Sequence, residues 1–236
     1  MNRRAFLAAG AVSAVGLSGC LGLGGGSGGS KHKSEEGYDT KEQDGVYVPL
    51  APLSDTHEWY KNDSAKFADA RGRKQYTTSH IKGAALSTAP DGLSKDDPVA
   101  SWSKDQKIVC YCGCPHHLSS MRAATLLNNG YTNVYVIDEG FWAWHEKGYP
   151  VSGENTSYTP PTYEINGLDA ASIGGTAWAR HLESGQMEAT DIKEDGSYSL
   201  HLTFYDVTPE SEIRIRTPDY EVSGTLSQLS SRVVKG

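Results

Sequence analysis

Cysteine and histidine side chains that can do chemistry are concentrated in one short stretch of this chain. Cys112 and Cys114 are separated by a single glycine, and His116 and His117 come directly after a proline. A cysteine thiolate is a nucleophile and a metal ligand, and a histidine can carry a positive charge or bind a metal ion. The spacing therefore indicates nucleophilic thiol chemistry, thiol redox chemistry or a metal site.

The residues on either side of this stretch must form the elements that hold it. Ile108 to Tyr111 is a short apolar run typical of a buried β-strand, and Met121 to Leu127 favours a helix that Ser119 or Ser120 can cap. Cys112 then lies at the carboxyl end of a strand, in a loop whose backbone N–H groups precede a helix. Such groups lower the pKa of a cysteine and stabilise a bound anion. The simpler alternative is a buried structural cysteine.

Five motifs surround this loop in a fixed order: Phe67-Ala68-Asp69-Ala70-Arg71, then Tyr76-x-x-x-His80-Ile81-x-Gly83-Ala84, then Asp105 to Cys112, then Ala123-Ala124-x-Leu126-Leu127-x-x-x-Gly130-Tyr131-x-Asn133-Val134, and Gly140-x-x-x-Trp144-x-x-x-Gly148-Tyr149-Pro150-Val151. Together they resemble the rhodanese family over roughly Val48 to Gly153. The resemblance implies an α/β fold with a parallel sheet flanked by helices. The alternation of apolar strand and helix patterns in this region favours the same architecture.

The resemblance also implies an activity, the transfer of sulfane sulfur through a cysteine persulfide. Counting forward from the strand makes Cys112 the nucleophile, whereas counting back from Ala123-Ala124 selects Cys114. We favour Cys112, because a loop absorbs an insertion more easily than a buried strand shifts its register. Cys114 is then the alternative nucleophile or a resolving thiol. The expected donor is a small sulfur compound such as thiosulfate or a persulfide, and the expected acceptor is a thiol or a protein.

The residues expected to contact the donor are Gly113, His116, His117 and Ser119. Relatives often carry arginines in this loop, and this chain offers the two histidines, whose charge is partial at neutral pH. Binding of thiosulfate should then weaken as the pH rises. The alternative is that both histidines are solvated loop residues.

Two other kinds of chemistry fit the same loop. Cys112 and Cys114 can form a strained disulfide or resolve one another's persulfide. Cys112, Cys114, His116 and His117 are ligands suited to zinc or copper. Adjacent histidines in so short a loop complete a tetrahedron with both cysteines only with difficulty, so we expect no metal and no cofactor. Cys110 is expected to be a packed core residue.

Three further polar residues belong to the motifs that carry the resemblance. We expect structural roles for all of them: an internal ion pair of Asp69 with Arg71, and a packing and hydrogen-bonding role for His80.

The N-terminal residues predict export and attachment to a membrane. Arg3 and Arg4 precede an apolar stretch, and Leu17-Ser18-Gly19-Cys20 ends it, which resembles a twin-arginine signal joined to a lipobox. We expect a signal peptide over residues 1–19, a lipid on Cys20 and a flexible Gly- and Ser-rich linker over residues 20–45. The protein would then be lipid-anchored at the extracytoplasmic face of the cell membrane.

Composition sets further limits. The net charge of −7 argues against nucleic acid as a partner, because phosphate binding needs a basic face. The few cysteines do not form a disulfide scaffold. A rhodanese-like domain is expected over residues 46–155 and a linker over residues 156–161, where polar residues and two prolines occur.

Short alternating β-prone runs separated by turn signals fill residues 162–236, which predicts a small all-β sandwich. No group of residues there suggests catalysis, so we expect an interaction or spacer module. The main alternative to a sulfurtransferase is consequently a non-catalytic rhodanese-like binding module, in which this second domain recruits a partner.

Overall fold

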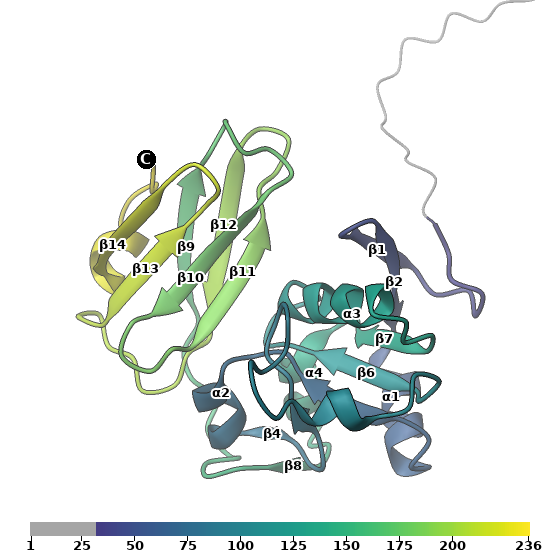
Figure 1. Ribbon diagram of the computed structural model, residues 1–236. Coiled ribbons are helices and arrows are strands. Elements are labelled where there is room, and N and C mark those ends of the chain that lie inside the picture. The colour runs from purple at the N-terminus through teal and green to yellow at the C-terminus, as the bar shows by residue number, and fades with distance from the viewer. Residues whose placement is uncertain (1–31) are drawn as a thin grey trace, which may run out of the picture. The chain divides into compact units, whose positions relative to one another are not determined.

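The computed structural model describes residues 32–236 (Figure 1). The expected signal peptide, the lipidation site Cys20 and the first part of the expected linker lie outside the described residues. The chain from Lys31 to Gly236 forms one unit. Among the described residues, no helix has both the length and the apolar character needed to cross a bilayer.

The N-terminal domain is built on a six-stranded sheet with the order β1-β2-β7-β6-β3-β5. All neighbouring strands are parallel except the β1–β2 pair. The predicted parallel sheet is therefore confirmed. Its strands are β1 (Thr40–Gln43), β2 (Val46–Ala51), β3 (Lys66–Asp69), β5 (Ala85–Leu86), β6 (Ile108–Tyr111) and β7 (Val134–Ile137).

Helices cover this sheet, and an apolar cluster lies on each of its two sides. Ile108 and Cys110 of β6 pack with the residues of α3, and Val109 and Tyr111 pack on the opposite side with Trp144 of α4. Cys110 is thus a core residue, as expected. The helices are α1 (Leu53–Lys61), α2 (Arg73–Thr78), the 3-10 helix η1 (Pro98–Ser101), α3 (Leu118–Asn128) and α4 (Gly140–Glu146), and the short strands β4 (His80–Ile81) and β8 (Val151–Ser152) pair beside them.

Two local features differ from the expectations. The expected linker up to residue 45 contains strand β1, a charged edge strand whose polarity hid it in the sequence. Helix α3 begins at Leu118 and has His117 at its N-cap, so Ser119 and Ser120 lie inside the first turn and cap nothing. Helix α1 begins after Pro52, and its first N–H donates to a carboxylate oxygen of Glu139.

The C-terminal domain consists of two antiparallel sheets that share one apolar core, as predicted. One sheet has the order β11-β10-β13-β14 and the other pairs β9 with β12 (Figure 1). A short helix that was not predicted from the sequence, α5, packs against this core. The elements are β9 (Tyr163–Leu168), β10 (Thr176–His181), β11 (Met187–Asp191), β12 (Ser197–Leu202), β13 (Glu212–Arg216), β14 (Glu221–Thr225) and α5 (Leu226–Ser230).

Candidate functional site

Cys112 lies immediately after β6, at the start of the loop that leads to α3. Its side chain is fully buried in a cluster with Leu118 of α3 and Ala189 of β11. The thiol donates to the carbonyl oxygen of Cys114 at 3.0 Å and lies 3.3 Å from the Ser119 hydroxyl oxygen. The strand end therefore places one thiol among polar groups of the loop and of the first helical turn.

These neighbouring groups determine the pKa of the Cys112 thiol. Burial by itself raises the pKa of the thiol, because the interior solvates a thiolate poorly. Hydrogen bonds with the side chains of Cys114 and Ser119, together with the backbone N–H groups of Ser119 and His117, outweigh burial and lower the pKa to about 7. The loop and helix start thus lower the thiol pKa, which is the direction expected from the sequence.

The base of the loop is held by the start of α4. The Phe141 N–H donates to the carbonyl oxygen of Cys112 at 2.8 Å. Gly140 has a positive φ of 79°, and a Cβ at this position would lie 3.1–3.2 Å from the carbonyl oxygens of Cys112, Gly113 and Cys114. The loop therefore rests on a position where only glycine provides both the backbone conformation and the space.

Cys114 has a different environment from Cys112. Its thiol lies 3.4 Å from Nδ1 of His117 and forms a hydrogen bond with the carboxyl group of Glu188, which comes from β11 in the C-terminal domain. The hydrogen bond with Cys112, burial and the nearby Glu188 together raise the pKa of Cys114 well above its ordinary value. Of the two loop cysteines, Cys112 is therefore the one that is readily deprotonated near neutral pH.

The two histidines do not supply the positive charge expected of them. His116 points to Asp138, with 3.3 Å between Nε2 and a carboxylate oxygen, while His117 faces Cys114. Burial lowers the pKa of His116, and it lowers that of His117 to about 4. Both imidazoles are consequently neutral at neutral pH. The structure therefore does not support a positive charge on these histidines at neutral pH. It gives no reason for thiosulfate binding to weaken as the pH rises above neutral.

The two motif residues Asp69 and Arg71 form the expected internal ion pair. Arg71 is fully buried, and its guanidinium donates to both carboxylate oxygens of Asp69 at 2.9 and 2.7 Å. It also donates to the carbonyl oxygen of Ser79 at 2.7 Å and lies over the ring of Phe141. His80 stacks on Tyr76 and pairs through Nδ1 with its carbonyl oxygen at 2.7 Å. These residues fix the backbone around the loop.

The C-terminal domain contributes directly to the site, which the sequence did not indicate. Gly113 lies between Trp142 of α4 and Glu188 of β11 in the C-terminal domain. A Cβ at Gly113 would lie 3.4 Å from Nε1 of Trp142 and 3.5 Å from a carboxylate oxygen of Glu188. Glu188 is only 3% exposed, and burial raises the pKa of its carboxyl group well above the ordinary value. The only signal in the sequence was a charged residue in the interior of an otherwise alternating β-prone run.

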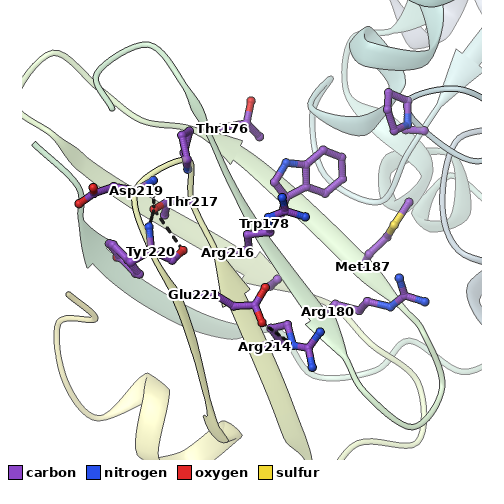
Figure 2. Close-up of a pocket in the computed structure, with 14 residues that line it drawn as sticks. Thr176, Trp178, Arg180, Met187, Arg214, Arg216, Thr217, Asp219, Tyr220 and Glu221 are labelled. Carbon is purple, nitrogen blue, oxygen red and sulfur yellow. Dashed lines mark hydrogen bonds and ion pairs between the residues drawn. The ribbon is translucent and has the colours of Figure 1, made fainter. Parts of the chain in front are cut away.

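A separate cavity of about 890 Å³ opens on the β10–β13–β14 face of the C-terminal sheet. Figure 2 shows Trp178, Arg180 and Arg216 along it, and the ion pair of Arg214 with Glu221. Cys112 does not line this cavity. Ala89, Met187 and Trp178, which do, belong to the cluster that buries Cys112, so the cavity and the thiol share these side chains.

Comparison with known proteins finds relatives of the N-terminal domain. Residues 53–147 match the family model of the rhodanese-like domain. The chain is 33% identical over 97 residues to the thiosulfate sulfurtransferase GlpE of Stutzerimonas stutzeri, which is 40% of this chain and 83% of that protein. It is 36% identical over 90 residues to the GlpE of Pseudomonas entomophila, 37% of this chain and 76% of that protein. The solved rhodanese-like domain of an Anabaena protein matches 48% of this chain and 85% of its own, with 23% identity and a TM-score of 0.42. Through its N-terminal domain, this chain belongs to the rhodanese-like family.

Proposed function

We propose that this protein is a sulfurtransferase that carries sulfane sulfur on Cys112. The Cys112 thiolate attacks the outer sulfur of the donor, and the sulfur–sulfur bond of the donor breaks as the Cys112 persulfide forms. With thiosulfate the leaving group is sulfite, and with a persulfide it is the parent thiolate. An acceptor thiolate then takes the outer sulfur and releases the Cys112 thiolate.

The observation that carries this proposal is the position of Cys112 in a rhodanese-like domain. The thiol lies where the central strand β6 ends, and backbone N–H groups of His117 and Ser119 are directed to it. These groups stabilise a thiolate, and they can equally stabilise the terminal sulfur of a persulfide anion.

The charges around the loop favour a persulfide over thiosulfate as the donor. The loop contains no arginine, His116 and His117 are neutral at neutral pH, and the Arg71 guanidinium is already paired with Asp69. A dianion such as thiosulfate finds only neutral donors in this loop, such as backbone N–H groups and the Ser119 hydroxyl, whereas a persulfide group carries at most one charge.

Mass spectrometry of the intact protein tests the proposal. Reduced protein is incubated with thiosulfate or with glutathione persulfide, and the wild type is compared with Cys112→Ser and Cys114→Ser. We expect the mass of one added sulfur atom in the wild type and in Cys114→Ser, and none in Cys112→Ser. Loss only in Cys114→Ser would assign the nucleophile to Cys114 and overturn the proposal.

A binding module is the second candidate function, and the burial of Cys112 favours it. The side chain has no exposed surface, and Ala189 of the C-terminal domain covers it. A domain of this kind would retain the fold and bind a partner without turnover. The absence of any sulfur adduct in all three proteins, with their folding verified by circular dichroism, would favour this function.

We further propose that a lipid on Cys20 holds the protein at the extracytoplasmic face of the membrane. The support is the sequence: two arginines, an apolar stretch and a small-residue segment ending in cysteine. Cell fractionation tests it. The wild type should partition with membranes, whereas Cys20→Ala should not, and replacement of Arg3 and Arg4 by lysine should retain the precursor inside the cell.

A further inference from the structure

Three side chains that can bind a metal ion converge beside the loop. The Sγ of Cys114, a ring nitrogen of His117 and a carboxylate oxygen of Glu188 all lie within 4.8 Å of one another. The first two come from the loop before α3, and the third comes from β11 of the C-terminal domain. Neither domain contains the set by itself.

The spacing of these atoms suits a tetrahedral ion. The distance between Sγ of Cys114 and Nδ1 of His117 is 3.4 Å. A tetrahedral zinc ion with ordinary zinc–sulfur and zinc–nitrogen bond lengths holds its sulfur and nitrogen ligands about 3.5 Å apart. An ion can therefore enter between these two side chains with little movement of either.

Glu188 supplies an additional reason to expect a cation. Its carboxyl group is buried, and one oxygen accepts from the Ala189 N–H at 3.0 Å. Within residues 32–236, no ion pair joins Glu188 to a lysine, arginine or histidine. A buried carboxyl group without a paired cation keeps its proton, and a bound metal ion would stabilise its ionised form.

We propose that Cys114, His117 and Glu188 form a zinc-binding site that joins the two domains. Thiolate, imidazole and carboxylate are all zinc ligands, and three of them leave one tetrahedral position open. A carboxylate is a poor ligand for copper(I), and a thiolate is a poor ligand for magnesium or calcium, which favours zinc over those ions. Zinc binds the deprotonated forms of Cys114 and Glu188, so binding releases the Cys114 thiol proton and the proton that the buried Glu188 carboxyl group holds, both to solvent.

This set differs from the one that the sequence suggested. Of the four loop residues that the sequence offered as ligands, His116 points away from the others toward Asp138. The two adjacent histidines therefore do not face one ion, as expected. The missing ligand comes from Glu188, distant in the sequence and near in the fold. The zinc site uses Cys114 and leaves the proposed nucleophile Cys112 outside the three ligands, so zinc binding and sulfur loading can be tested separately.

The test uses the full-length protein, purified in detergent, reduced and stripped of metal by a chelator. It is titrated with cobalt(II), whose visible spectrum reports tetrahedral coordination and whose near-ultraviolet bands report a thiolate ligand, and zinc is then added as competitor. We expect one equivalent of cobalt, displaced by zinc. Cys114→Ala and Glu188→Gln should each weaken zinc affinity by about tenfold or more. The control Cys110→Ala, which removes a buried thiol elsewhere on β6, should keep wild-type affinity.

A second measurement keeps the test decisive if a variant does not fold. In the wild type, saturating zinc should protect Cys114 from alkylation, as located by peptide mapping, while excess chelator restores its reactivity. Binding in Cys114→Ala equal to that of the wild type, or alkylation of Cys114 unaffected by zinc, would refute the site. Formation of the sulfur adduct on Cys112 is measured separately in metal-free protein, so the failure of one proposal is distinguishable from the failure of the other.

Discussion

The Cys114 thiol and the Glu188 carboxyl group form a hydrogen bond that joins the two domains at the edge of the rhodanese loop. Glu188 is buried and Cys114 is partly buried. The hydrogen bond with Cys112, burial and the nearby Glu188 raise the pKa of Cys114, whereas burial and the nearby Cys112 raise the pKa of Glu188. The C-terminal domain is therefore part of the site, in contrast to the separate interaction or spacer module that the sequence suggested.

The titration of Cys112 gives the first prediction. In metal-free protein, the thiolate of Cys112 should appear with a midpoint near pH 7, because hydrogen bonds to Sγ lower its pKa to about 7. The pKa of Cys110 and that of Cys114 are both raised, so neither should titrate in this range. Thiolate absorbance in the ultraviolet, followed against pH, measures this. Ser119→Ala should move the midpoint upward, and an unchanged midpoint would show that the hydroxyl does not stabilise the thiolate.

The buried ion pair should be important for stability. Asp69→Asn leaves the Arg71 guanidinium buried without its counter-charge, so the free energy of unfolding should fall by about 3–5 kcal/mol. Urea denaturation measures the change. Lys61→Ala, which removes the exposed pair with Glu58 on α1, is the control and should change it by no more than about 0.5 kcal/mol. Similar losses in both variants would contradict a special role for the buried pair.

Gly140 should be needed for the loop as well as for the fold. Gly140→Ala combines a positive φ with close approach to three loop carbonyl oxygens, and we expect a loss of about 2–4 kcal/mol together with slower sulfur loading of Cys112. Gly130→Ala is the matched control, since its φ of 84° is similar but a Cβ there meets nothing within 4 Å. It should lose only about 1 kcal/mol and load sulfur normally.

Zinc should stabilise the folded protein if the site at Cys114, His117 and Glu188 exists. A ligand that binds only the folded state adds about 2.7 kcal/mol when its free concentration is 100 times the dissociation constant. Thermal unfolding with and without zinc should therefore show a higher midpoint with zinc in the wild type. In Glu188→Gln the increase should be about half as large or smaller, and an equal increase in both proteins would locate the zinc elsewhere.

Much of the N-terminal domain could be predicted because its signals are local. The strand Ile108 to Tyr111 and the helix after the loop follow from periodicity and turn residues. Strand β1 was missed because an edge strand with charged residues has no apolar pattern. The end of the helix was placed within one residue, but its start was not, because His117 rather than a serine occupies the N-cap.

What the sequence by itself determined is the family, the parallel sheet, and the position of Cys112 between a buried strand and a helix. These depend on residue order and on interactions between near neighbours. What only the tertiary structure decided is the charge state of the site and its complete set of residues. The pKa of His117 depends on burial by distant segments, and Glu188 reaches Cys114 only because β11 packs against the loop. Burial and proximity across domains are properties of the folded chain, and no local pattern encodes them.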